Sequence, residues 1–129
     1  MRTGAMDWIG LLGRVVMSVI FIVGGIGKAL APAATMAYFA KDGVPVPGAA
    51  YAVALAVEIG GGFLFLVGWR VRSVALLLAV WCIATAMVAH YHPENREQMI
   101  NFMKNVCMAG GFLQIVAFGA GRLSLSRGQ

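Results

Sequence analysis

The sequence has few charged residues for its length. Only 12% of its 129 residues are charged, and its five acids are outnumbered by ten lysines and arginines. Hydrophobic residues make up 60% of the chain, and the mean hydropathy is +0.83. A water-soluble domain of this size could not cover its surface with so little polar material. The composition therefore excludes a soluble protein and indicates an integral membrane protein.

Cysteine and histidine are also scarce, with two of each. Cys82 and Cys107 lie inside apolar runs, which excludes a disulfide framework and a C-x-x-C motif. The expected helices allow these two thiols to meet, although burial as small apolar side chains explains them more simply. His90 and His92 lie at one helix end and offer no facing pair of haem ligands, so we predict no metal. The basic residues are scattered at the ends of apolar runs, which argues against nucleic-acid binding.

Four apolar segments are long enough to cross a bilayer. A helix rises about 1.5 Å per residue, so about 20 residues span a hydrocarbon core of roughly 30 Å. The expected spans are residues 8–30, 48–69, 73–89 and 102–118, with a short interfacial helix over 33–42. The sequence thus predicts an all-α fold, in which a single domain over residues 1–129 forms an integral membrane antiparallel four-helix transmembrane bundle.

An even number of spans places both termini on the same side of the membrane. Arginines favour this side, whereas nearby acids partly offset the cations of the opposite side. The arginines on the side of the termini are Arg2, Arg70, Arg72, Arg122 and Arg127. We therefore predict that both termini lie in the cytoplasm.

A single acid, Glu58, lies near the middle of the second apolar run. An ionised carboxylate at this depth costs roughly 2.5–3.5 kcal/mol on insertion scales, so it must be paired, protonated or used. Arg14 in the first span differs from it in depth by about 7 Å, which an arginine side chain can reach. One interpretation is a structural Arg14–Glu58 ion pair that fixes the register of two helices. The other is a carboxylate that binds a proton or a ligand, and the sequence leaves both open.

Further polar residues gather at the opposite end of the expected bundle, above Glu58. The candidate ligand-binding residues are Lys28, Glu58, His90, Asn101, Lys104 and Asn105. Cations and amides around a glycine-rich helix end suit a polar head group, anionic or quinone-like, whose apolar body lies among the spans. The simpler alternative is that the two lysines only extend their ammonium groups to the membrane surface.

Several short motifs follow one another along most of the chain. They are G-R-x(6)-F-x-x-G-G-x-G-K over residues 13–28, Gly43-Val44-Pro45, Glu58 with Gly61-Gly62, Gly68 with Arg72, Asn101-Phe102-x-Lys104-Asn105 followed by Gly110-Gly111, and Gly119-x-Gly121-Arg122-Leu123-Ser124-Leu125. Each motif is short, but in this order they resemble the DoxX family of membrane proteins.

The resemblance implies a four-helix protein of the bacterial inner membrane. One related branch is a subunit of thiosulfate:quinone oxidoreductase, and other relatives are linked with redox stress and membrane oxidoreductase complexes. By similarity, the functional positions are Arg14, Lys28, Glu58, Lys104 and Asn105. We therefore expect a small inner-membrane subunit of, or accessory to, a membrane oxidoreductase, with lipid and other membrane or redox subunits as partners.

No flavin, haem or iron–sulfur motif is present in the sequence, so we expect no intrinsic cofactor. Electrons would have to come from a bound quinone or from a partner subunit, and whether the chain itself is catalytic stays open. Two alternative functions also remain. The protein could be a non-catalytic structural subunit packed against a larger membrane complex, or a small transporter of protons or an organic solute.

Overall fold

The computed structural model describes residues 2–126, so Arg127 lies outside the described part of the chain. All regular structure within that part is helical. In chain order the elements are α1 (Ala5–Leu30), α2 (Pro32–Lys41), α3 (Pro47–Leu55), the π-helix η1 (Ala56–Gly61), α4 (Gly62–Val67), α5 (Val71–Thr85), the π-helix η2 (Ala86–His90) and α6 (Arg96–Phe118). Three of these join end to end into one continuous span, α3–η1–α4, and α5 continues into η2.

Four helices in the described residues are long and apolar enough to cross a membrane, which confirms the predicted all-α fold. The short helix expected over residues 33–42 is α2, which begins at Pro32, where the missing amide proton costs nothing. The last span begins at Arg96, well ahead of the predicted residue 102, because the Asn95 side chain caps it. Its Oδ1 accepts a hydrogen bond from the Gln98 amide at 3.2 Å, so the helix includes a polar first turn.

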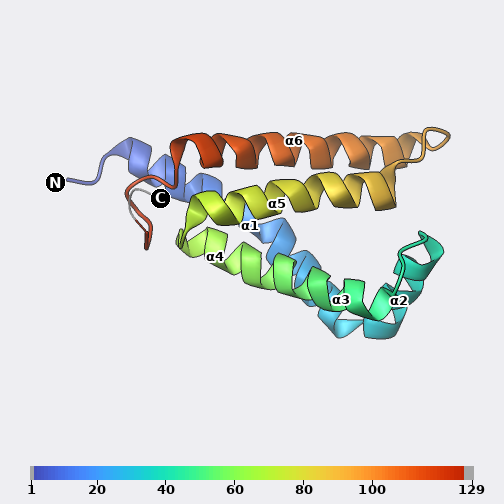
Figure 1. Cartoon of the computed structure of the whole chain (residues 1–129). Helices are drawn as coiled ribbons and strands as arrows, with labels where there is room; N and C mark the ends of the chain where they lie inside the picture. Colours follow the sequence, from blue (N-terminus) through green and yellow to red (C-terminus); the bar gives the residue numbers. More distant parts are fainter. Residues whose placement is uncertain (1, 127–129) are drawn as a thin grey trace.

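The spans form two antiparallel helical hairpins. One consists of α1 and the span α3–η1–α4, and the other of α5–η2 and α6. Figure 1 shows the hairpins close together where α1 begins and α6 ends, and further apart at the opposite end. α2 lies at this open end and packs on α1 and α3. The ends of the described chain therefore lie on one side, as an even number of spans requires.

Three phenylalanine rings join the two hairpins in the core. Phe112 of α6 lies edge-on to Phe21 of α1, with ring centroids 5.5 Å apart, and edge-on to Phe65 of α4, at 5.0 Å. Edge-to-face contacts of this kind contribute about 0.5–1.5 kcal/mol beyond the area that they bury. Leu78 of α5 is fully buried beside them. The core thus holds the hairpins together on the side of the termini, and no comparable aromatic cluster in the described residues joins them at the open end.

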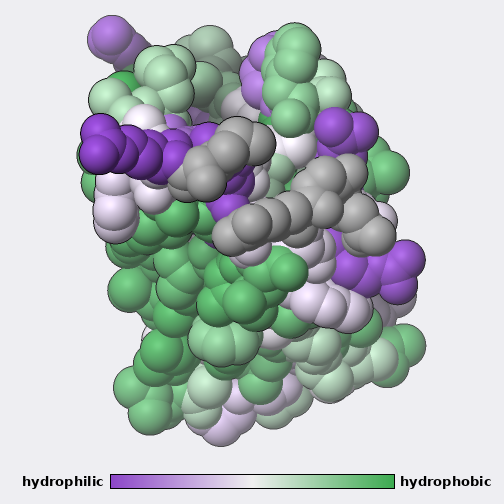
Figure 2. Space-filling view, turned by 90° about the vertical axis from the view of Figure 1, so that its left-hand side faces the viewer, coloured by the Kyte–Doolittle hydropathy of each residue, from purple (hydrophilic) through white to green (hydrophobic). Residues whose placement is uncertain are grey.

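Most of the large apolar side chains point outward. On α1 these include Val19, Val23 and Ile26, each about half exposed. Figure 2 views the end where the termini lie and shows hydrophilic side chains around the chain ends, with hydrophobic side chains over much of the remaining face. In water such a surface would be an aggregation hazard, whereas in a bilayer it faces lipid.

Candidate functional site

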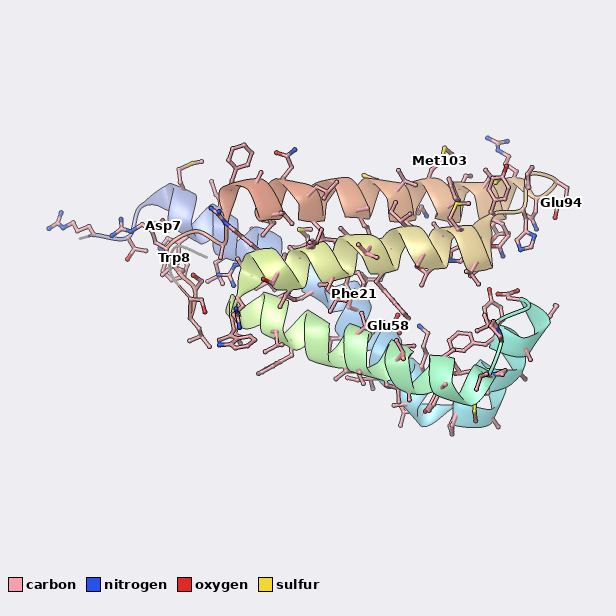
Figure 3. All side chains as sticks on the ribbon, in the orientation of Figure 1. Asp7, Trp8, Phe21, Glu58, Glu94 and Met103 are labelled. Carbon is pink, nitrogen blue, oxygen red and sulfur yellow. The ribbon has the colours of Figure 1, made fainter. Side chains whose placement is uncertain are left out.

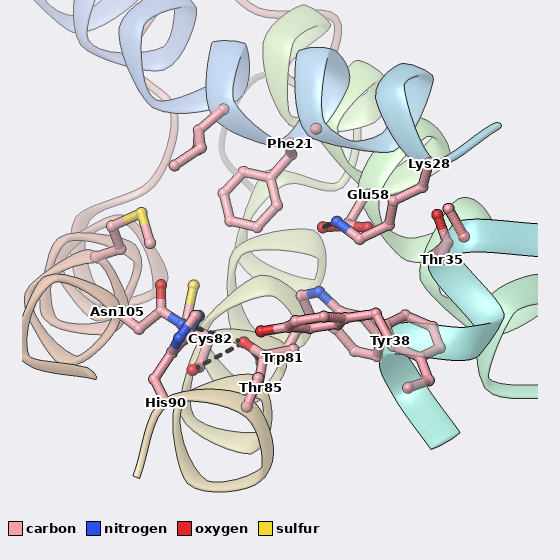
Figure 4. A pocket seen from close by; sticks show the side chains of 16 residues that line it. Phe21, Lys28, Thr35, Tyr38, Glu58, Trp81, Cys82, Thr85, His90 and Asn105 are labelled. Atoms are coloured by element: carbon pink, nitrogen blue, oxygen red, sulfur yellow. Dashed lines mark hydrogen bonds and ion pairs between the residues drawn. The ribbon is translucent and has the colours of Figure 1, made fainter. Parts of the chain in front are cut away.

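A cavity of about 500 Å³ lies between the two hairpins at the open end. We call it the hairpin cavity. Its lining comes from α1, α2, η1, α5, η2 and α6, and includes Phe21, Gly24, Lys28, Thr35, Tyr38, Glu58, Trp81, Cys82, Thr85, His90, Asn105 and Met108. Figure 3 shows Phe21 and Glu58 pointing into the space between the hairpins, whereas Met103 points away from it. The hairpin cavity combines aromatic walls with several polar groups (Figure 4).

Glu58 forms an ion pair with Lys28 across one side of the cavity. The Lys28 ammonium donates a hydrogen bond to Glu58 Oε1 at 3.0 Å, and the two side chains are 31% and 12% exposed. The second carboxylate oxygen, Oε2, is buried and has no hydrogen-bond partner among the described residues. Lys28 also lies in the last turn of α1, where a cation interacts favourably with the helix dipole. The carboxylate is therefore neutralised in charge, but it keeps one oxygen able to accept a hydrogen bond.

Local backbone geometry places Glu58 at this wall. The residue lies in η1, a π-helical stretch, and such stretches insert an extra residue into a helical turn and often occur at functional sites. α1 approaches η1 closely at Gly25, where an added Cβ would lie 2.6 Å from Ile59 Cγ1 and 3.2 Å from Glu58 Cβ. Only glycine fits at this crossing. No sequence pattern indicated the π-helix. The glycine-rich end of α1, noted in the sequence, is the segment that packs against it.

The opposite wall is a chain of hydrogen bonds between the helices of the second hairpin. Asn105 Nδ2 donates to Thr85 Oγ1 at 3.3 Å, and the Thr85 hydroxyl is directed to the backbone carbonyls of Trp81 and Cys82, at 2.9 and 3.2 Å. At the outer end His90 Nδ1 is hydrogen-bonded to Gln98 Oε1 at 2.8 Å. These contacts fix the amide and the imidazole at the cavity wall.

The short helix α2 closes the cavity from the outer side with Thr35 and Tyr38. The Tyr38 ring extends into the cavity in Figure 4. Burial, and then the nearby Asp42 carboxylate, raise the pKa of Tyr38 above its ordinary value of 10.0, so the phenol keeps its proton at neutral pH and can donate a hydrogen bond. Sequence reasoning missed Tyr38, because the composition of α2 does not say which face turns inward.

The predicted Arg14–Glu58 ion pair is wrong, because Arg14 has other partners. This side chain is only 1% exposed, and it donates to the carbonyl oxygens of Phe65 at 3.4 Å, Leu66 at 2.6 Å and Leu123. The first two are carbonyls of the last turn of α4, where helical partners run out. The Phe65 carbonyl also accepts a hydrogen bond from the Gly68 amide at 3.1 Å. Arginine therefore caps a helix end near the termini, while the lysine at the other end of α1 meets Glu58.

Two other predicted site residues, Asn101 and Lys104, do not line the hairpin cavity. Asn105, Met108 and Phe112 follow one another at helical spacing on the inner face of α6, and Asn101 lies one turn before them. Lys104 precedes Asn105 by one residue, which turns it about 100° away, and it is exposed. Asn101 is half-buried on the inner stripe but lies outside the cavity lining. The cavity thus brings together Lys28, Glu58, His90 and Asn105.

The remaining candidate groups lie apart from one another. His92 is near Glu94 in the loop before α6, with 3.3 Å between Nδ1 and Oε1. Within the described residues no three histidine, cysteine or acidic side chains gather as a metal site. Cys82 is buried at the wall of the hairpin cavity, whereas Cys107 is exposed on the outer side of α6. The two thiols are both free and lie in different environments.

The fold and the cavity define a small helical membrane protein with a largely apolar cavity, which holds a few polar groups, between two transmembrane hairpins. Comparison with known proteins agrees with this class. The sequence model of the DoxX family matches residues 9–91, and two Escherichia coli K12 proteins align over most of their length. The chain belongs to the DoxX family, as its motifs predicted.

The two relatives are similar to this chain to nearly the same degree. Inner membrane protein YphA is 33% identical over 122 residues, which cover 91% of this chain and 87% of YphA. Inner membrane protein YqjF is 34% identical over 117 residues, which cover 91% of this chain and 88% of YqjF. No solved structure matches the chain.

Proposed function

We propose that this protein is a small inner-membrane accessory subunit of a redox enzyme, and that it binds the head group of a quinone-like ligand in the hairpin cavity. The names of both E. coli relatives place those proteins in the inner membrane, and the four spanning helices of this chain suit the same location. The chemistry of the cavity supports the ligand class.

The observation that carries this proposal is that only one of the two Glu58 carboxylate oxygens has a hydrogen-bond partner among the described residues. Oε1 is bonded to Lys28, while Oε2 is buried without a partner in the described residues. An unpartnered buried acceptor costs about 1–3 kcal/mol. Oε2 has no accessible surface, so a turn of the Glu58 side chain would have to bring it to the cavity, where a hydroxyl of a reduced quinone would satisfy it. The oxidised ring carries carbonyls instead, and these would accept a hydrogen bond from the ammonium of Lys28. One ion pair therefore serves both redox forms.

The rest of the cavity also suits a flat ring. Its volume of about 500 Å³ is typical of small-molecule sites. Phe21, Tyr38 and Trp81 provide aromatic faces for a ring to pack on, and Asn105 offers an amide on the wall opposite Glu58. Reduction of a quinone to the quinol takes two electrons and two protons, which a partner subunit would deliver, and oxidation of the quinol would return them to that subunit. The chain's residues would bind and orient the head group.

The proposal predicts that the affinity for the quinone ring depends strongly on the Lys28–Glu58 ion pair. In lipid nanodiscs, the purified protein should bind dimethoxy-methyl-benzoquinone, which has the ring without a chain. Lys28→Met should weaken binding of this oxidised ring about tenfold or more, and Glu58→Gln should do the same for the reduced hydroquinone, because a charge-assisted hydrogen bond contributes roughly 1.5–3 kcal/mol. Equilibrium dialysis or quenching of tryptophan fluorescence measures the affinity.

Lys104→Met is the matched control. It removes the same charge at the same end of the protein, but from an exposed position outside the hairpin cavity. Binding by this variant should stay within about twofold of wild type. Absence of saturable binding to wild type would refute the proposal, and an equal loss in Lys104→Met would show a nonspecific effect of charge.

A second candidate function is that of a structural subunit, and one surface feature favours it. A groove on the outer face of α5 and α6 has four small residues among larger aliphatic ones, namely Ala79, Ala84, Ala109 and Gly110. Small residues let a neighbouring transmembrane helix approach closely. Purification in mild detergent distinguishes the two functions, since a structural subunit would bring a larger membrane protein with it and no quinone.

A further inference from the structure

A second cavity adjoins the hairpin cavity. It has a volume of about 340 Å³, and we call it the side chamber. Its lining consists of Phe39, Asp42, Gly43, Val44, Pro45, Ala50, Val53, Trp81, Ala84, Thr85, Val88 and Ala89. Four of these residues, Phe39, Trp81, Thr85 and Ala89, line the hairpin cavity as well. The two cavities therefore share a wall made largely of two aromatic side chains.

The side chamber is apolar along almost its whole length. Valines, alanines and a proline form most of its walls, and the only charged side chain is Asp42 at the end of α2. The turn after α2 forms the outer boundary. It is held by the hydrogen bond from the Val44 amide to the Phe39 carbonyl, at 3.0 Å. Val53 and Val88 are each 51% exposed, so the chamber opens sideways between α3 and η2, toward the lipid.

We propose that the side chamber holds the apolar chain of the ligand whose ring lies in the hairpin cavity. The ligand is then a ring-headed lipid with an alkyl or prenyl chain, which passes Trp81 and Phe39 and leaves into the bilayer between Val53 and Val88. This inference rests on the proposed function. It adds the class of ligand, a membrane-resident quinone rather than a small diffusible one, and a route to the site from within the bilayer.

The chemistry of the chamber favours a chain over other occupants. Water needs two to four polar partners to be held in a cavity, and these apolar walls offer few. A peptide segment would bring backbone amides and carbonyls, which need hydrogen-bond partners at membrane depth. A hydrocarbon chain makes no such demand, and the shared wall places the side chamber next to the space for the ring.

Affinity alone would be a poor readout for this proposal. A chain that moves from lipid into the chamber exchanges one apolar surrounding for another, so little hydrophobic free energy is gained. The position of the chain is the decisive quantity. A benzoquinone with a decyl chain that carries a diazirine at its midpoint can report that position after irradiation in nanodiscs. Mass spectrometry of the peptides then locates the adducts.

The expected result is that adducts concentrate on Val44, Val53 and Val88, and that excess chain-less benzoquinone removes them. Ala50→Phe should reduce these adducts about tenfold, because its ring would fill the space that the chain needs. Ala49→Phe is the matched control. It adds the same ring at the neighbouring exposed residue, which lines neither cavity, and should leave the adducts unchanged.

A second pair of variants keeps the inference testable if Ala50→Phe fails to fold. Val88→Phe narrows the opening of the chamber, and Val19→Phe makes the same change at an equally exposed residue of α1, each being 51% exposed. Only Val88→Phe should displace the adducts. Binding of the chain-less ring should be unaffected by either variant, because neither residue lines the hairpin cavity.

The possible outcomes separate this inference from the proposed function. If the chain-less ring binds but the adducts spread over outward residues such as Val19 and Val23, the chain lies in the bulk lipid and the inference is overturned. The same holds if a headless diazirine alkane labels the chamber equally well. If the chain-less ring does not bind at all, the proposed function fails, and the inference fails with it.

Discussion

Two cations on one face of α1 have different partners, and the difference follows from their side-chain chemistry. Arg14 directs a planar group with several donors at three backbone carbonyls, which a single ammonium could not bond in that arrangement. Lys28 is a point charge on a flexible stem, and it reaches one oxygen of Glu58 while staying partly exposed. Arg14 therefore fixes the end of a helix, whereas Lys28 belongs to the candidate site.

At the scale of these residues we predict strong coupling between Lys28 and Glu58. Lys28→Met leaves a carboxylate that is 12% exposed without its cation, and should lower the free energy of unfolding by roughly 1–3 kcal/mol. Glu58→Gln should cost less, because the lysine is more exposed and can extend to the membrane surface. Thermal unfolding in one detergent measures both.

The double variant Lys28→Met with Glu58→Gln distinguishes coupling from independent effects. If the pair interacts as the structure shows, the double variant should be less destabilised than the sum of the two single variants. Simple additivity would contradict an ion pair. Pairing Glu58→Gln with Arg14→Met provides the comparison, since those two residues have separate partners and their costs should add.

At the scale of the elements, the crossing of α1 and η1 positions the site. The π-helix carries Glu58, and Gly25 lets α1 come close enough for Lys28 to meet it one turn later. On the other side of the cavity η2 carries His90, so both π-helical stretches contribute a polar side chain to the cavity. The spacing of the walls thus depends on one close contact between two helix backbones.

Gly25→Ala should disturb this crossing. The new methyl group would lie 2.6 Å from Ile59 Cγ1, so η1 must move, at a cost of roughly 1–3 kcal/mol in stability. Gly27→Ala, on the same helix, meets nothing within 4 Å and should be neutral or stabilising by up to about 1 kcal/mol. Thermal unfolding of the two variants checks this, and equal melting temperatures would argue against the close crossing.

At the scale of the whole molecule, the two ends of the bundle differ. On the side of the termini, the segment after α6 packs against the turn between α4 and α5, with amide-to-carbonyl hydrogen bonds from Leu125 to Val67 and from Ser126 to Gly68. Gly68 has φ +75°, and a Cβ at this position would lie 2.5 Å from Ser124 Cβ, which is a clash. The opposite end contains both cavities. The protein is therefore closed at one end and hollow at the other.

The bias of arginines predicts which end faces the cytoplasm. Arg2, Arg70, Arg72 and Arg122 all lie on the side of the termini, before α1, at the turn from α4 into α5 or after α6. Reporter fusions after the last residue should be active in the cytoplasm, and fusions in the loop around Glu94 should be active outside. The reverse pattern would overturn the orientation, and would turn the opening of the hairpin cavity toward the cytoplasm.

The sequence by itself determined the class of protein, the number of spans and the residue at the centre of the site. Those features depend on the length of apolar runs and on the cost of one carboxylate within them, which are properties of the chain in one dimension. The ordered motifs also indicated the DoxX family. Lys28, His90 and Asn105 form one predicted group because they occur at similar depths to one another, above Glu58.

The tertiary structure decided which of these residues meet. A depth estimate placed Arg14 within reach of Glu58, but it could not include the carbonyls at the end of α4 or the segment after α6, which come together only in the folded chain. Lys104 shares the depth of the site, yet the rotation of α6 turns it outward. Tyr38 and Trp81 line the cavity because of how α2 and α5 are placed in the fold. Rotation and crossing of helices result from packing between distant segments, and hydropathy does not encode them.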